Sequence, residues 1–139
     1  MRINLFNDVG KFKLRRKKKH IEWIAKISKN LGLDKEGGIN IILVGRNTIL
    51  KINREFLGHN YLTDVISFKY EEDSEIFGEI YICPYQVNQN AKRFNVSFED
   101  ELRRVIAHGM LHLSGYNDGT DKEREEMRRM EDSMLDLWS

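Results

Sequence analysis

The stretch that decides the fold of this chain runs from His108 to Asp118 and reads His-Gly-Met-Leu-His-Leu-Ser-Gly-Tyr-Asn-Asp. It continues an apolar pattern of helical period, formed by Leu102, Val105, Ile106, Gly109, Met110 and Leu113. On that helix His108 and His112 lie one turn apart, so both imidazoles project from one flank and can bind a single ion. Gly115 can adopt the left-handed conformation that ends a helix, and the chain can then bring Asp118 back as a third ligand. We therefore predict a transition-metal site at His108, His112 and Asp118, most naturally for one Zn²⁺ per chain, with a fourth position left for water.

The spacing His-x-x-x-His-x-x-Gly-x-x-ligand is that of the elongated zincin motif, with two departures. Gly109 stands where a metalloprotease has its Glu base, which disfavours peptide hydrolysis. Asp118 replaces a third His, so the ligand set is harder, the bound water is less acidic, and tolerance to manganese or nickel is wider. The alternative is that two helical histidines merely face a polar groove, but the placement of Gly115 and Asp118 favours the metal.

The same residues resemble the signature of the YbeY family of bacterial endoribonucleases, His-Gly-x-Leu-His-Leu-x-Gly-Tyr-Asp-His. Residues 108–116 match it at every fixed position, whereas Asn117 and Asp118 do not. Two further blocks agree, because Thr-Asp-Val-Ile-Ser-Phe at 63–68 and Gly-Glu-Ile-Tyr-Ile at 78–82 are similar to two strands of that family. The resemblance covers nearly the whole chain.

The resemblance implies a metal-dependent, single-strand-specific endoribonuclease in ribosomal RNA maturation, including 16S rRNA 3′ end processing and ribosome quality control. Its partners would be single-stranded or ribosomal RNA and the ribosome or its small subunit. His108 and His112 would act in catalysis through the metal, and the nucleophile stays open between water and an RNA 2′-hydroxyl. The alternative is a ribosome-associated assembly factor with a structural metal and little or no catalysis. A small metallohydrolase with an unrelated substrate ranks last.

One departure from the family bears on catalysis. The family carries an Arg considered important for activity just before the glycine at 58, and here that residue is Leu57. Its loss removes a phosphate clamp or a transition-state stabiliser. Arg54, one turn earlier, and His59, two residues later, are the candidate catalytic substitutes, although a loop His is more often a polar surface residue.

Positive charge is concentrated near the N-terminus, in Lys13, Arg15, Arg16, Lys17, Lys18 and Lys19. Such a run can neutralise phosphates and steer the protein to RNA. A solvated loop followed by a first helical turn explains it equally well. For His20, Glu101 and Arg104 the expected role is that of surface residues.

Periodicity and turn residues predict one α/β (α+β) domain over 1–139, with a mixed sheet of about four strands, about five helices and a zincin-like metal helix. The strands are expected at 3–7, 39–44, 65–68 and 77–83, with the second buried on both faces and the last two forming an antiparallel hairpin. The helices are expected at 21–31, 47–57, 84–94, 97–113 and 120–138, with Asn47 capping the second.

Composition sets the remaining bounds. The 139 residues carry a net charge of +1, so no global field indicates a polyanionic partner. The single cysteine, Cys83, excludes an internal disulfide and is expected to be a small buried apolar residue. No apolar run approaches the roughly 20 residues of a membrane helix, and no signal-peptide core is present. We predict a soluble, cytoplasmic protein without a membrane partner.

Overall fold

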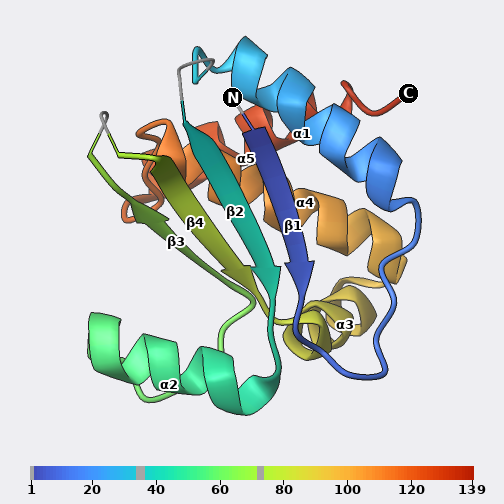
Figure 1. Ribbon diagram of the computed structural model, residues 1–139, viewed down its shortest axis with the longest axis vertical. Coiled ribbons are helices and arrows are strands. Elements are labelled where there is room, and N and C mark those ends of the chain that lie inside the picture. The colour runs from blue at the N-terminus through green and yellow to red at the C-terminus, as the bar shows by residue number, and fades with distance from the viewer. Residues whose placement is uncertain (1, 34–36, 72–73) are drawn as a thin grey trace.

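The computed structural model describes residues 2–33, 37–71 and 74–139. Over these residues the chain forms four strands and five helices, arranged as Figure 1 shows. The strands are β1 (Arg2–Asn7), β2 (Gly38–Leu43), β3 (Val65–Lys69) and β4 (Ile76–Ile82). The helices are α1 (Lys17–Asn30), α2 (Arg46–Leu57), α3 (Pro84–Phe94), α4 (Phe98–Leu113) and α5 (Asp121–Leu135). The predicted fold class is confirmed.

The strands form one mixed sheet in the order β1-β2-β4-β3. β1 pairs with β2 and β2 with β4 in parallel, whereas β3 pairs antiparallel with β4. The predicted hairpin is therefore confirmed, and Val65 lies opposite Ile82 in it. β1 and β3 are the two edges of the sheet, so segments next to these strands lie on opposite sides of the molecule.

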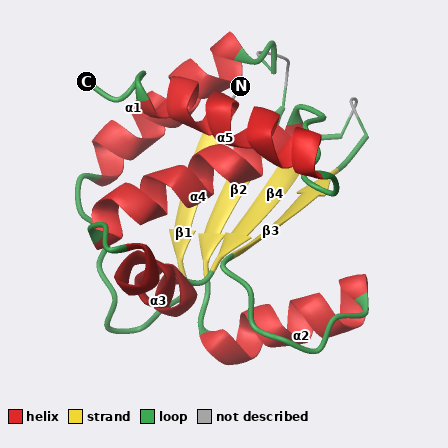
Figure 2. Cartoon of the chain, turned by 180° about the vertical axis from the view of Figure 1, so that it is seen from behind, coloured by secondary structure: helices red, strands yellow, loops and turns green. Residues whose placement is uncertain are grey.

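One face of the sheet is covered by helices. Seen from behind in Figure 2, α1, α4 and α5 lie in front of the strands. α4 packs against β3 and β4 and also contacts α3 and α5, which makes it the central helix of the domain. α2 lies beyond the carboxyl end of β2, where Ile49 joins a second, smaller apolar cluster. No helix within the described ranges is long and apolar enough to cross a membrane.

The main core lies between the sheet and α4. Ile39, Ile41 and Leu43 of β2 are buried there together with apolar residues of α4. On the opposite face of β2, Asn40 and Ile42 are only half-buried, and Ile42 packs against the second cluster. The prediction that this strand is buried on both faces was therefore wrong for this face. Cys83 is fully buried in that cluster, as predicted.

α4 packs closely on the sheet because two glycines, Gly109 of α4 and Gly78 of β4, lie where the helix and the sheet meet. A methyl group on Gly109 would lie 2.9 Å from Ile80 Cγ2 and 3.2 Å from Ser67 Oγ. A methyl group on Gly78 would lie 2.9 Å from both Cδ atoms of Leu113. The Ser67 hydroxyl also donates a hydrogen bond to the Gly109 carbonyl over 3.2 Å. This contact fixes the rotation of α4, and with it the direction in which the histidines beside Gly109 project.

Two further local predictions were wrong. α2 begins at Arg46, with Gly45 as its N-cap, because the Ile49 amide already bonds the Gly45 carbonyl; Asn47 therefore lies inside the first turn. His20 is 1% exposed, not a surface residue. Its ring packs 4.8 Å from the Trp138 ring, and its Nδ1–H donates to the Arg16 carbonyl over 2.9 Å. The charged run that precedes His20 concealed its position on the buried face of α1.

The buried His20 gives the stability of the fold a pH dependence. Burial lowers the pKa of His20 below its ordinary 6.5, with the positive charge of Arg103 acting in the same direction and Glu99 opposing it. The unfolded chain takes up this proton at about pH 6.5, whereas the folded chain does so only at lower pH. The contribution of His20 to stability is thus present above pH 6.5 and lost as pH falls through its lower folded pKa. We expect His20→Phe to lose less unfolding free energy between pH 7.5 and 5.5 than the natural chain, as measured by urea unfolding. Equal losses in the two proteins would contradict this assignment.

Candidate metal centre

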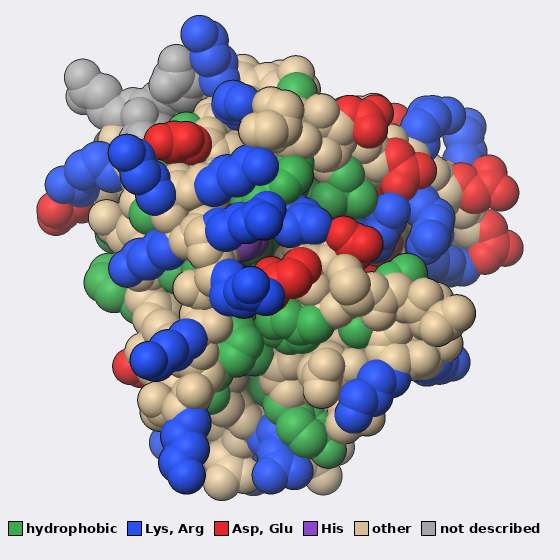
Figure 3. Space-filling model, turned by 90° about the vertical axis from the view of Figure 1, so that its right-hand side faces the viewer, with side chains coloured by type: hydrophobic (Ala, Val, Ile, Leu, Met, Phe, Trp, Pro, Cys, Tyr) green, Lys and Arg blue, Asp and Glu red, His purple; other side chains and the backbone are tan. Residues whose placement is uncertain are grey.

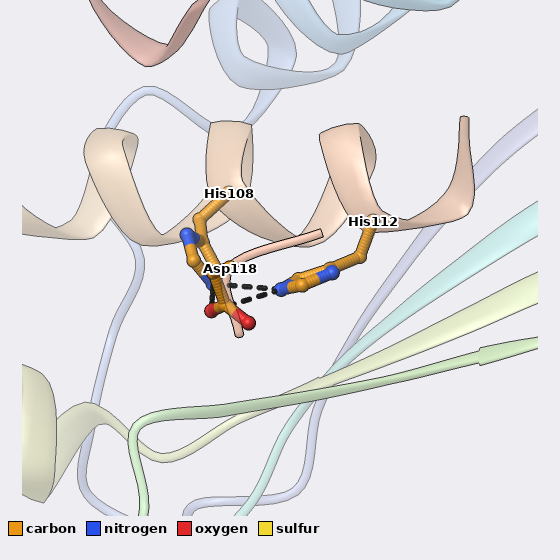
Figure 4. Close-up of side chains that lie close together, drawn as sticks. All are labelled: His108, His112 and Asp118. Atoms are coloured by element: carbon orange, nitrogen blue, oxygen red, sulfur yellow. Dashed lines mark hydrogen bonds and ion pairs between the residues drawn. The ribbon is translucent and has the colours of Figure 1, made fainter. Parts of the chain in front are cut away.

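The fold brings His108, His112 and Asp118 together, with all three ligand atoms within 4.8 Å of one another. Figure 4 shows the two imidazoles projecting from α4 toward Asp118, which returns from the loop beyond the helix. His112 Nε2 lies 3.0 Å from His108 Nε2. Asp118 Oδ2 lies 3.3 Å from His108 Nε2 and 3.4 Å from His112 Nε2. These three atoms form a nearly equilateral triangle.

The size of this triangle fits a small tetrahedral ion. Ligands held about 2.0–2.1 Å from a tetrahedral Zn²⁺ lie about 3.3–3.4 Å apart. The observed separations of 3.0, 3.3 and 3.4 Å correspond to one face of such a tetrahedron. Two imidazole nitrogens and one carboxylate oxygen are also ligands that this ion accepts. The three residues therefore form a site that can hold a metal ion and leave one position open.

Local sequence explains why the third ligand returns. α4 ends at Leu113, and Gly115 follows with φ 106°, in the left-handed region. The Tyr116 amide then bonds the Leu111 carbonyl over 3.0 Å, which folds the chain back along the helix. At the other end of the loop, Arg124 of α5 donates to the Asp118 carbonyl over 3.2 Å. The loop is thus held at both ends.

The capping box that starts α5 also holds this loop. The Thr120 hydroxyl accepts from the Glu123 amide, and the Glu123 carboxylate accepts from the Thr120 amide. The N-cap of α5 is therefore fixed two residues after Asp118. The cap of α4 at Ser97 is simpler, because its hydroxyl accepts from the Asp100 amide without a reciprocal bond in the described structure.

His108 has a further partner that the sequence did not reveal. Its Nδ1 lies 2.7 Å from Glu131 Oε2, a carboxylate of α5. Burial alone lowers the pKa of His108, but the hydrogen bond and charge of Glu131, together with the charge of Asp118, outweigh it and raise the pKa above its ordinary value. Glu131 lies four residues after Met127 and three before Met134, on the buried stripe of α5. A carboxylate on an apolar stripe was the signal that would have identified it.

The prediction that Glu101 and Arg104 are surface residues was wrong. Glu101 is 6% exposed, and burial raises the pKa of its carboxyl. Arg104 donates to Glu131 over 2.9 Å and to Asp132 over 2.7 Å. Both side chains lie on the flank of α4 that carries His108, and α5 covers that flank. The apolar period of α4 gave no sign that a second helix packs there.

A pocket of about 450 Å³ opens beside the ligands. It is bounded by His108, His112 and Asp118 on one side and by β3 with the segment that leads into it, residues 63–67, on the other. Residues 63–67 of the block thus lie against the candidate metal centre. Among the described residues that line this pocket, Lys69 at the end of β3 contributes the one cationic side chain. The sequence did not indicate Lys69 as a site residue, because a polar residue at the end of a strand carries no functional signal by itself.

The predicted substitutes for the missing Arg do not reach this pocket. Leu57 itself lines it, but Arg54 and His59 are not among the residues that do. Arg54 donates to the Asn60 side chain over 3.2 Å. The His59 ring stacks on Tyr61, with ring centroids 5.2 Å apart. Both side chains therefore contact residues of the loop that follows α2.

The predicted RNA-binding run lies on the other side of the molecule. Residues 13–16 lie in the segment that joins β1 to α1, and residues 17–19 form the first turn of α1, at the edge of the sheet opposite β3. Three strand spacings of about 4.8 Å, or roughly 14 Å, separate the two edges. Figure 3 faces the β1 side and shows Lys and Arg side chains spread over it, with Asp and Glu among them. The run therefore forms no part of the pocket wall.

The fold and the cluster together define a class of protein, a small α/β domain with a candidate mononuclear metal site of zincin-like spacing. The model of the family described as "Endoribonuclease YbeY" matches residues 3–139. The chain therefore belongs to the endoribonuclease YbeY family, which confirms the resemblance seen in the sequence. It is 43% identical to Endoribonuclease YbeY of Flavobacterium psychrophilum, over 96% of this chain and 94% of that protein. It is 50% identical to Endoribonuclease YbeY of Chlorobaculum tepidum, over 71% and 72% of the two chains.

A solved structure shares the fold. The solution structure of TM1509 from Thermotoga maritima matches with a TM-score of 0.63 and 33% sequence identity. The match covers 97% of this chain and 87% of that chain. The architecture seen here is therefore shared with an experimentally determined protein.

Proposed function

We propose that this protein is a metal-dependent endoribonuclease that cleaves single-stranded RNA during ribosomal RNA maturation, including the 3′ end of 16S rRNA. The observation that carries the proposal is the triangle formed by His108 Nε2, His112 Nε2 and Asp118 Oδ2, beside a pocket open to solvent. The endoribonuclease names of its relatives support the reaction class. A ribosomal RNA substrate implies, as part of this proposal, that the protein acts with the ribosome or its small subunit in the cytoplasm.

His108, His112 and Asp118 would hold the ion, with Zn²⁺ as the proposed metal. When bound, the ion supplies Lewis-acid stabilisation of a phosphodiester oxygen and lowers the pKa of a water molecule. The imidazoles act in catalysis as its ligands, and the Asp118 carboxylate completes the set. Gly109 offers no general base at the protease position, so the reaction does not depend on a Glu there.

Lys69 takes the place of the missing Arg in this proposal. Its ammonium group lies 5.7 Å from the centre of the Phe77 ring, at the end of the strand that borders the pocket. A cation there can neutralise a phosphate next to the scissile bond, as a point charge without the bidentate geometry of an Arg. Arg54 and His59 would contact RNA further along, outside the pocket. The run that contains Lys13, Arg15, Arg16, Lys17, Lys18 and Lys19 would bind RNA that extends around the molecule.

The test is cleavage of an end-labelled single-stranded RNA by metal-stripped protein, before and after Zn²⁺ is restored. We expect cleavage only with the metal, none by His108→Ala, and none of a duplex of the same sequence. Lys69→Gln should reduce the rate about tenfold through the loss of one charged phosphate contact. Lys26→Gln, an exposed change on α1, is the matched control and should leave the rate unchanged. No cleavage by protein shown to carry the metal would support the assembly-factor alternative instead.

A further inference from the structure

We propose that Glu131 is a positioning residue that orients His108 for metal binding, and that Arg104 holds Glu131 in place. The proposal deepens the metal site of the preceding subsection and depends on metal binding at His108, but not on RNA cleavage. It assigns a role to α5, which supplies none of the three ligands. The evidence lies in how these side chains share their hydrogen bonds.

The first step concerns the two nitrogens of the His108 ring. Nδ1 lies 2.7 Å from Glu131 Oε2, whereas Nε2 faces His112 and Asp118. A carboxylate can only accept a hydrogen bond, so the proton of the neutral ring is placed on Nδ1. The lone pair is then on Nε2, which is the atom that binds the ion. Glu131 thus selects the tautomer of His108 that can act as a ligand, and fixes the plane of its ring.

The second step concerns the other oxygen of the same carboxylate. Glu131 Oε1 accepts a hydrogen bond from Arg104 Nη1 over 2.9 Å. Nη2 of the same guanidinium donates to Asp132 Oδ1 over 2.7 Å. The Glu131 side chain is 8% exposed, so its charge would be costly to bury without a cation. Arg104 therefore gives the buried Glu131 carboxylate a cationic partner and fixes its direction. Arg104 and His108 lie one turn apart on α4, so one side of that helix contacts both oxygens of the Glu131 carboxylate.

The third step is the difference between the two histidines. Within the described part of the chain, a carboxylate contacts Nδ1 of His108, whereas no hydrogen bond of this kind involves Nδ1 of His112. His108 also lies one turn farther than His112 from the carboxyl end of α4. We infer that His108 is oriented before the metal arrives, and that the other two ligands close around it.

The competing explanation is that Glu131 and Arg104 form an ion pair that merely joins α4 to α5. Three variants separate the two roles. Glu131→Gln keeps an acceptor oxygen but loses the charge, and Glu131→Ala loses both. Asp132→Asn is the matched control, because it weakens the other contact of Arg104 without touching His108. A purely structural role would affect Glu131 and Asp132 variants through folding stability alone.

Three measurements on the whole chain, without RNA, test the proposal. They are the Zn²⁺ dissociation constant by chelator competition, the His108 tautomer in metal-free protein by long-range ¹H–¹⁵N NMR, and thermal unfolding of the metal-free protein. We expect the dissociation constant to rise about tenfold in Glu131→Gln and up to about a hundredfold in Glu131→Ala. The Nε2 resonance of His108 should move toward a mixture of tautomers in both, while Asp132→Asn changes affinity less than about threefold.

Unchanged Zn²⁺ affinity and an unchanged His108 tautomer in the Glu131 variants would overturn the proposal. An equal loss of affinity in Asp132→Asn would also overturn it, because it would assign the effect to the helix contact. If Glu131→Ala does not fold, Glu131→Gln decides the question, since it conserves shape and one acceptor. Because no RNA is present, these results are independent of whether the natural chain cleaves its proposed substrate.

Discussion

His112→Ala is expected to lose its bound metal and still fold. His112 would supply one of the three candidate ligand atoms, 3.0 Å from His108 Nε2 and 3.4 Å from Asp118 Oδ2. Zinc sites with several ligands bind with about 10–16 kcal/mol in total, so removal of one ligand costs about 3 kcal/mol or more. That loss raises the dissociation constant at least about a hundredfold. The His112 side chain is 29% exposed at the pocket, so its truncation opens no core cavity.

The measurement is the metal content per chain after dialysis against a weak chelator, together with the far-UV circular dichroism and the melting temperature of the metal-free protein. His59→Ala is the matched control, because His59 lies in an exposed loop outside the pocket. We expect one ion per chain in the natural protein and in the control, and close to none in His112→Ala. An unchanged ratio of metal to protein in His112→Ala would rule out the assignment of its imidazole as a ligand.

Gly109→Glu is expected to unfold the protein and not to create a peptidase. Gly109 occupies the slot of the metalloprotease base, but a Cβ there would lie 2.9 Å from Ile80 Cγ2. Glycine to alanine within a helix gains about 1 kcal/mol of propensity, whereas overpacking a core contact costs about 1–3 kcal/mol. Gly109→Ala should therefore be neutral to destabilising by up to about 2 kcal/mol. A Glu adds a buried carboxylate, which costs several kcal/mol more and consumes much of a total stability of about 5–15 kcal/mol.

Urea unfolding of the metal-free proteins measures this effect without any contribution from the ion. Gly10→Ala is the control, because a methyl group there meets no atom within 4 Å. It should change the free energy of unfolding by less than about 0.5 kcal/mol. A Gly109→Glu protein as stable as the natural chain would show that α4 can move away from the sheet. The close contact would then not be what excludes the protease base from this helix.

The clustering of His108, His112 and Asp118 was predictable from sequence because its geometry is local. His108 and His112 are separated by one helical turn, and the turn at Gly115 follows from a residue that accepts a positive φ. Only nine residues lie between His108 and Asp118, so no long-range packing had to be known. The antiparallel hairpin was accessible for the same reason, since its two strands are neighbours in the chain.

What lies around the ligands was not predictable. Glu131, which contacts His108, follows it by 23 residues in the sequence. Lys69, which lines the pocket, precedes His108 by 39 residues. Neither separation leaves a periodic signal, because the contact exists only once α5 and β3 are packed on α4. The buried position of His20 likewise depends on Trp138, at the far end of the chain.

The sequence by itself determined the elements of this protein, its three candidate ligand residues and its family, because each is encoded in short spacings and fixed residue patterns. The tertiary structure decided the rest. The strand order β1-β2-β4-β3 places the basic run and the metal centre at opposite edges of the sheet. The packing of α5 on α4 gives His108 its carboxylate partner, and the course of β3 directs Lys69, not Arg54 or His59, to the pocket. Propensity and periodicity act over a few residues, whereas a site is completed by side chains that the burial of apolar faces brings together from distant segments.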